Sequence, residues 1–304
     1  MMEKKIIVSC DLCGSSHFHL LFGDVTDTAL DTPGKFSLVE CVRCGLIFLN
    51  PRPAGAALGD YYPSGYDPYI IKKGLMNHVG ALVLGREKKH IQQFLPRGGS
   101  LLEVGCAGGE LLSLFQKDGY KVRGLEMDGG CVRAAREGYH VQIWEGRFEE
   151  FSFPAGVRFD GIIMRYVLEH LPSPKAALRT LRTLIATGGI VYLTLPNYGS
   201  WERRLFGRSW HCFDVPRHFH IFSEALIRLY AKETGFRVAA VRYDLVPNDW
   251  IGSIGRYFHE KKYMRLARFF TYKNLLLIGV FAPFGICAKL FKKSSRFAVV
   301  LRAY

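Results

Sequence analysis

The sequence lacks the features that mark several classes of protein. It has eight cysteines in 304 residues, too few for the disulfide framework of a small secreted scaffold. Its N-terminus carries a short apolar patch, residues 6–8, in place of a secretory signal, which predicts a cytoplasmic protein. Its apolar run at residues 275–291 contains 17 residues, somewhat fewer than the roughly 20 that span a bilayer.

Acidic residues are scarce near the C-terminus. Residues 251–304 contain eleven Lys or Arg and one acid, Glu260, so this segment supplies +10 of the net charge of +14. The basic charge is therefore local, and it does not indicate a general nucleic-acid-binding surface. The apolar content of 49% is ample for a folded core.

Four of the cysteines form two identical pairs. Each pair has the spacing Cys-x-x-Cys and is followed by glycine, and 27 residues separate the pairs: Cys10, Cys13, Cys41 and Cys44. Two such knuckles can supply four thiolates in a tetrahedron, which leaves no open position on the metal. A redox pair would normally occur once and open a helix. The pattern predicts structural Zn²⁺ in a zinc ribbon over residues 1–50.

The clearest strand–turn–helix pattern lies at residues 99–115. The apolar run 101–104 ends at a glycine cluster, and a helical pattern follows. Glycines let the backbone approach a ligand, and N–H groups at a helix start can hold an anion. A second strand, 120–125, ends at Glu126, 21 residues after Gly105, where an acid can bind ribose hydroxyls. A nucleoside-bearing ligand is predicted, the alternative being a merely structural turn.

The motif has the spelling Glu103-x-Gly105-x-Ala107-x-Gly109. It resembles the first motif of class I S-adenosylmethionine-dependent methyltransferases, although Ala107 replaces a usual glycine. The segments 167–174, 188–189 and 193–197 resemble the same family, closest to its ubiquinone-O-methyltransferase-like branch. The resemblance implies S-adenosylmethionine as methyl donor. The candidate cofactor-binding residues are Glu103, Gly105, Ala107, Gly109, Glu126, Met127, Phe148 and Arg165.

Strands and helices continue to alternate after Glu126. This alternation predicts an α/β fold with a doubly wound, mostly parallel, Rossmann-like sheet and ligands at the carboxyl ends of its strands. The resembled family has a seventh, antiparallel strand, for which residues 297–303 are the candidate. Residues 76–304 then form a methyltransferase domain with a hydrophobic and basic hairpin insertion at 247–295. Residues 51–75, rich in Pro, Gly and Tyr, are a linker or a lid.

Methyl transfer to a hydroxyl benefits from a general base with a pKa near 7, which suits histidine. Two histidines are candidates: His170 after the fourth strand and His218 in the aromatic connection 198–222. For each, the alternative is a residue that only makes structural hydrogen bonds. The sequence does not choose between them.

The expected acceptor is a small molecule, a glycan or a lipid-linked precursor. Basic residues flank the apolar run over 261–296, which suggests an anionic membrane surface at the inner face of the membrane; a packed core or a dimer interface is the alternative. Pro283 and Gly285 interrupt the run, which predicts two short helices or a re-entrant hairpin here. A second hypothesis, an RNA-directed methyltransferase or RNA-binding protein, is disfavoured because the predicted ribbon has five acids and two basic residues between Cys10 and Cys44.

Overall fold

The computed structural model describes residues 5–30, 32–54, 61, 75–271 and 274–304, with only the backbone for 75–79. The predicted linker or lid, 51–75, lies mostly outside the described residues.

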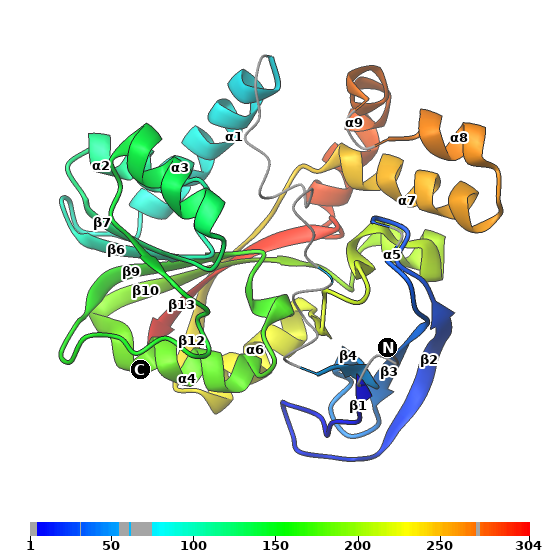
Figure 1. The fold of residues 1–304 in the computed structure, drawn as a ribbon, viewed down its shortest axis with the longest axis horizontal. Helices are drawn as coiled ribbons and strands as arrows, with labels where there is room; N and C mark the ends of the chain where they lie inside the picture. Colours follow the sequence, from blue (N-terminus) through cyan, green and yellow to red (C-terminus); the bar gives the residue numbers. More distant parts are fainter. Residues whose placement is uncertain (1–4, 31, 55–60, 62–74, 272–273) are drawn as a thin grey trace.

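A seven-stranded sheet forms the centre of the molecule (Figure 1), in the order β12-β13-β10-β9-β6-β7-β8. Its strands are β6 (Ser100–Val104), β7 (Lys121–Glu126), β8 (Ile143–Glu145), β9 (Phe159–Arg165), β10 (Ile185–Pro196), β12 (Phe236–Tyr243) and β13 (Arg296–Ala303). β13 runs antiparallel to both of its neighbours. The predicted doubly wound sheet with a seventh, antiparallel strand is confirmed.

Helices cover both faces of this sheet, as apolar side chains on both faces of its strands require. α1 (Leu75–Gln92), α2 (Glu110–Lys117) and α3 (Gly129–Tyr139) lie on one face, and α4 (Pro174–Leu184) and α6 (Glu224–Glu233) on the other (Figure 1). Ser173 and Ser223 cap α4 and α6 by accepting backbone N–H groups. β8 begins only at Ile143, because α3 continues to Tyr139 and ends at His140 in the left-handed conformation.

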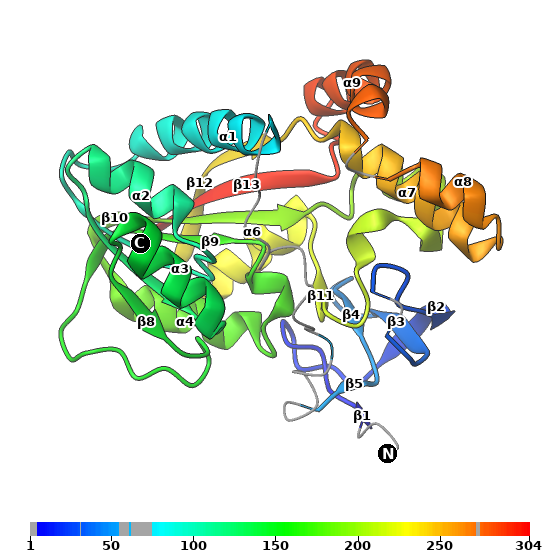
Figure 2. The ribbon, with the colours of Figure 1, turned by 45° about the horizontal axis from the view of Figure 1, so that its top comes forward.

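The N-terminal residues form a smaller sheet in the order β11-β4-β3-β2. Its strands are β2 (Phe18–Val25), β3 (Phe36–Cys41), β4 (Ile47–Leu49) and β11 (His220–Ile221), and β1 (Lys5–Ile6) pairs separately with β5 (Arg52–Pro53). β11 comes from the connection after β10, so a segment from the C-terminal part of the chain completes the N-terminal sheet. Figure 2 shows β11 beside β4.

The insertion before β13 contains three helices in place of the predicted hairpin: α7 (Pro247–Glu260), α8 (Met264–Phe269) and α9 (Leu275–Leu290). The prediction that Pro283 separates two helices is wrong, since α9 continues through it. A helical proline removes one backbone hydrogen bond and crowds the carbonyl group four residues earlier. This cost is local, and α9 also packs against α7, where the rings of Trp250 and Phe284 lie 5.8 Å apart. Among the described residues, no helix is both long and apolar enough to cross a membrane.

Candidate functional site

The glycine turn after β6 has the shape expected of a cofactor cradle. Gly105, Ala107 and Gly109 all have positive φ angles, of 68°, 46° and 78°. A Cβ on Gly105 would lie 2.5 Å from Val167 Cγ2, so the turn after β6 packs directly against the segment after β9. Ala107 adopts a left-handed conformation that costs an L-residue roughly 1–2 kcal/mol, which explains why glycine is usual at this position.

Glu126, at the end of β7, is held rigidly beside that turn. Its Oε2 accepts the N–H of Ala107 at 2.9 Å, and its Oε1 accepts the N–H groups of Met127 and Asp128 at 2.8 and 2.9 Å. Burial raises the pKa of Glu126, and the three amides partly offset the shift. The turn and the acid predicted from their spacing are thus in contact.

Two other predicted cofactor residues, Glu103 and Arg165, form a buried ion pair on neighbouring strands. Arg165 Nε donates to Glu103 Oε1 at 2.9 Å, and Arg165 Nη1 lies 3.2 Å from Glu87 Oε2 on α1. Burial raises the pKa of Glu103 to about 7, with Arg165 opposing the shift. Within the described part of the chain, Glu103 Oε2 has no hydrogen-bond partner. Sequence reasoning missed Glu87, which comes from a helix and carries no motif.

The last two predicted cofactor residues lie at the ends of β7 and β8. Met127 follows Glu126 and is partly exposed, while Phe148 is buried against Phe153 with ring centroids 5.9 Å apart. Both positions are at the carboxyl edge of the sheet, where ligands bind in such folds.

The structure brings together the two predicted base candidates. The rings of His170 and His218 meet edge to face with centroids 4.7 Å apart. His170 Nδ1 lies 3.1 Å from the carbonyl oxygen of Arg217, and His218 Nδ1 lies 2.8 Å from that of Cys212. A carbonyl only accepts, so both Nδ1 atoms carry the proton and each neutral ring has its lone pair on Nε2. Burial lowers the pKa of His170 to about 3 and also lowers that of His218.

Glu169 completes this group. It is fully buried, and in the described region neither carboxylate oxygen has a hydrogen-bond partner. One ligand atom from each of Glu169, His170 and His218 lies within 4.8 Å of the others, and burial raises the pKa of Glu169 to about 8. Two imidazoles and a carboxylate can share a proton or hold a divalent cation. Sequence reasoning missed Glu169, although its position next to His170 was a usable signal.

The insertion also contributes to the site. Asp249 of α7 forms a two-point ion pair with Arg296 at the start of β13, with both oxygen–nitrogen distances at 2.7 Å. The Arg296 guanidinium lies 5.0 Å from the ring centroid of Tyr166, which directly follows β9. Cys212 Sγ lies 3.5 Å from Asp249 Oδ2. This group is polar and charged, and its Asp249 and Cys212 are buried.

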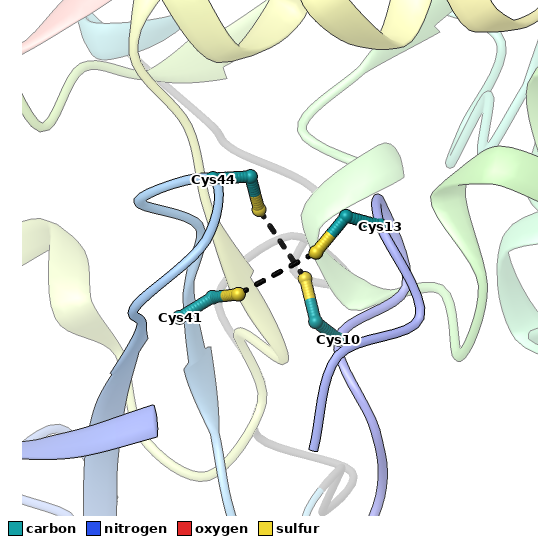
Figure 3. Close-up of side chains that lie close together, drawn as sticks. All are labelled: Cys10, Cys13, Cys41 and Cys44. Carbon is teal, nitrogen blue, oxygen red and sulfur yellow. Dashed lines mark hydrogen bonds between the residues drawn. The ribbon is translucent and has the colours of Figure 1, made fainter. Parts of the chain in front are cut away.

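The four N-terminal cysteines converge on one point (Figure 3). Cys10 Sγ lies 3.4 Å from Cys44 Sγ, and Cys13 Sγ lies 3.5 Å from Cys41 Sγ. All four sulfur atoms lie within 4.8 Å of one another. The glycines after each pair, Gly14 and Gly45, have φ angles of 74° and 72° and donate to the carbonyls of Cys10 and Cys41. The two knuckles have the same local geometry, which suits a single four-thiolate metal site.

Comparisons with known proteins agree with this geometry. A family model described as a methyltransferase domain matches residues 80–241. Ubiquinone biosynthesis O-methyltransferases of Erwinia tasmaniensis and Escherichia coli are 28% identical over 130 residues, which are 40% of this chain and 54% of each relative. The matched region thus spans about half the length of these relatives.

A solved structure of coclaurine N-methyltransferase, bound to N-methylheliamine and SAH, shares the fold. Its TM-score is 0.51 at 13% identity, over 77% of this chain and 75% of that one. The matched family model covers more than half of the sequence and the sheet has the topology predicted for that family. The chain therefore belongs to the class I S-adenosylmethionine-dependent methyltransferases.

Proposed function

We propose that this protein transfers the methyl group of S-adenosylmethionine to a hydroxyl group of a small molecule. The observation that carries the proposal is the neutral pair of half-buried His170 and buried His218. His170 follows Val167, which touches the glycine turn after β6. The names of the relatives, which are O-methyltransferases, support the choice of oxygen as acceptor atom.

The glycine turn and Glu126 would hold the cofactor. The Glu126 carboxylate is fixed by backbone amides, so it is preorganised to accept ribose hydroxyls. The Glu103–Arg165 pair would keep the strand ends beneath the cofactor in register. The sulfonium methyl group is already activated, so the chain has to align the acceptor oxygen with it and exclude water.

The histidine pair would remove the acceptor's proton. A neutral imidazole with its Nδ1–H bonded to a backbone carbonyl receives a proton at Nε2. Burial raises the pKa of Glu169 to about 8, so its carboxyl group is largely protonated at neutral pH. A positive charge on a ring within 4.8 Å would favour its ionisation, and the carboxylate would then stabilise the imidazolium. A divalent cation held by the same three side chains would act differently, by lowering the pKa of a bound hydroxyl.

Structural zinc at the four cysteines is the second part of the proposal. Zn–S bonds of about 2.3 Å in a tetrahedron place sulfur atoms roughly 3.8 Å apart. Two of the separations here, 3.4 and 3.5 Å, are close to that value. Four protein ligands leave no position for substrate, so this metal would stabilise the fold.

The third part concerns where the acceptor comes from. α8 and α9 expose large apolar side chains, among them Phe269, Leu276, Leu290 and Phe291. Exposed lysines and arginines lie on the same segment, including Lys261, Lys262 and Arg265. An apolar surface with a basic rim suits the headgroup region of an anionic membrane, which favours a lipid-linked acceptor and a peripheral position at the inner face of the membrane.

The experiment is acceptor discovery with a labelled donor. Purified protein, deuterated-methyl S-adenosylmethionine and separate lipid and aqueous metabolite extracts are incubated, and products carrying the label are identified by mass spectrometry. We expect a labelled methyl ether. His170→Asn and His218→Asn should each lower its rate by about 10² to 10⁴ with cofactor binding intact. Exposed His140, which has a left-handed backbone that asparagine tolerates, gives the matched control His140→Asn. Labelled RNA or a labelled amine would contradict the proposal.

A further inference from the structure

The N-terminal residues 5–54, here called the cysteine module, share their core with the methyltransferase domain. Their buried side chains fall into two clusters, and each cluster contains residues from both parts. One joins the module to the helices beside the sheet, through Cys10, Leu12, Phe48, Leu168, Phe222 and Tyr230. The other joins it to the connection after β10, through Phe36, Leu38, Leu49, Trp210, Phe213 and Phe219.

The module fixes the residue that follows His218. Phe219 donates its N–H to the carbonyl of Glu169 at 2.8 Å and accepts the N–H of Leu49 at 2.9 Å. The next two residues form β11 and pair with β4, with His220 opposite Phe48. The backbone after His218 is therefore held between the candidate base cluster on one side and the module on the other.

The module also fixes the residue that precedes His218. Arg217 donates Nη1 and Nη2 to the two carboxylate oxygens of Asp27 at 2.7 and 2.8 Å, and both side chains are fully buried. Arg217 also pairs with Asp214. Its carbonyl oxygen is the group to which His170 Nδ1 is bonded. One arginine thus connects the module to both histidines.

The cysteines hold the strands that make these contacts. β3 ends at Cys41, and the Cys41 N–H donates to the carbonyl of Leu46 at 2.9 Å, closing the turn into β4. Asp27 lies between β2 and β3, where it also accepts hydrogen bonds from Ala29, Leu30 and Thr32. A metal that joins the Cys41 knuckle to the Cys10 knuckle would lock the hairpin that pairs with β11.

We propose that the cysteine module is a wall of the acceptor site and that its metal sets the positions of His218 and His170. Asp27 and Arg217 are positioning residues in this scheme, since they act through the histidines. The inference rests on the proposed function in taking these histidines as the residues that face the acceptor. Metal loss then disorders the acceptor side of the site and leaves the cofactor side, built on β6 and β7, intact.

The test reads the histidines directly and needs no acceptor. Protein with ¹⁵N-labelled histidine is studied by NMR, and the Nδ1–H signals of the pair are assigned with His170→Asn and His218→Asn. Both signals should exchange slowly with water in the zinc-loaded protein, because both N–H groups are bonded to carbonyls. Three samples are compared with it: chelator-treated protein, Cys41→Ser and Asp27→Asn. The matched control is Asp24→Asn, an exposed acid in the same module whose side chain pairs with Lys35.

We expect ring N–H exchange to become about tenfold faster or more in the three test samples, with calorimetric affinity for S-adenosylmethionine within about twofold of the untreated protein. Asp24→Asn should match the untreated protein in both respects. Unchanged ring signals after metal loss overturn the inference. Parallel loss of cofactor affinity also overturns it, because the module would then support the whole domain. Failure of the proposed methyl transfer leaves the NMR result unaffected, so the two failures are distinguishable.

Discussion

Gly105 and Val167 are in contact across the two neighbouring loops that define the site: an ideal Cβ at Gly105 would lie 2.5 Å from Val167 Cγ2. Gly105 ends the first strand of the sheet, and Val167 precedes His170 by three residues. The cofactor turn and the histidine segment can therefore approach only because position 105 has no side chain. The contact therefore joins the candidate cofactor turn to the segment that carries the candidate base His170.

Gly105→Ala should consequently damage both functions. A methyl group there meets Val167 and is also forced into a positive φ of 68°, so we expect a loss of stability of about 1–3 kcal/mol and weaker cofactor binding. Gly98→Ala separates the two effects, because Gly98 has the same φ of 68° and its added Cβ would meet nothing closer than 3.7 Å. Urea unfolding and calorimetry provide the readouts. Equal effects of the two substitutions would rule out the Val167 contact as the cause.

Glu126→Gln should weaken cofactor binding. The substitution keeps the side chain's shape but removes the charge that, in the proposed site, would accept two ribose hydroxyls, and a hydrogen bond to a charged group contributes roughly 1.5–3 kcal/mol. Calorimetry with S-adenosylmethionine should therefore show affinity reduced by about tenfold or more. Glu137→Gln, on the exposed side of α3, serves as the control. Wild-type affinity in Glu126→Gln would place the ribose elsewhere.

The proximity of these candidate cofactor residues was predictable because the pattern that carries them is local. Gly105 and Glu126 lie 21 residues apart in one strand–turn–helix–strand unit, and the alternation of apolar segments fixed the type of nearly every later strand and helix. The antiparallel β13 was predicted from family resemblance, since an eight-residue apolar strand does not itself reveal its direction.

The contacts that build the acceptor side could not be predicted in this way. Arg217 and Asp27 are 190 residues apart, and no periodicity or spacing links them. β11 contains two residues, too few for a strand pattern, and it belongs to the module's sheet only because of tertiary packing. Arg165 was assigned to the cofactor from its place after a strand, whereas its position between Glu103 and Glu87 depends on α1. The local rule failed at Pro283 because it neglects tertiary packing, here of α9 against α7 through Phe284 and Trp250.

Cys41→Ser should release zinc and destabilise the cysteine module. Structural zinc contributes folding free energy directly, and serine is a poor replacement for a thiolate ligand. Metal analysis should find one zinc per chain in the wild type and none after dialysis of the variant. Cys287→Ser is the control, because Cys287 is exposed on α9 and far from the cluster in sequence. Full zinc content in Cys41→Ser would exclude the four-cysteine site.

Acid should destabilise the protein through its buried histidines. Burial lowers the pKa of His170 to about 3, that of His211 to about 4, and that of His218, while an unfolded histidine titrates near 6.5. The unfolded chain therefore binds more protons below about pH 6.5, and each such histidine removes up to about 1.4 kcal/mol of stability per pH unit as pH falls. Above about pH 6.5 these histidines are neutral in both the folded and the unfolded chain, so none of this stability is lost.

The measurement is the urea midpoint between about pH 7.5 and pH 5.5, where His218→Asn should reduce the pH slope. Burial raises the pKa of Glu169 to about 8, so this residue makes the protein more stable as pH falls, which is the opposite of the histidine effect. Zinc binding also weakens in acid. Both effects are shared by wild type and variant, so the difference in slope isolates the histidine. Burial raises the pKa of Asp27, but the hydrogen bonds from Arg217 outweigh burial and lower this pKa overall. Protonation of Asp27 therefore changes stability only below the pH range of the measurement. The control is His19→Asn, at an exposed position, which should leave the pH slope of the urea midpoint unchanged. An unchanged slope in His218→Asn would show that His218 does not contribute to the acid sensitivity.

The apolar surface of α9 should bind anionic membranes. Leu276 and Leu290 are 84% and 72% exposed, and burying each in the interface gains about 0.8 kcal/mol per CH₂ group, with about 1 kcal/mol more for each nearby basic residue. The intact chain should float with vesicles containing phosphatidylglycerol, less so at high salt, and little with neutral vesicles. Leu276→Glu with Leu290→Glu should abolish flotation. Leu82→Glu, at a site on α1 that is 68% exposed, should not.

Point variants are preferable to deletion of the insertion, because α7 supplies Asp249 to the site. If the intact chain stays in the soluble fraction at low salt, or if Leu82→Glu is as damaging as the α9 variant, the apolar face of α9 binds something other than lipid.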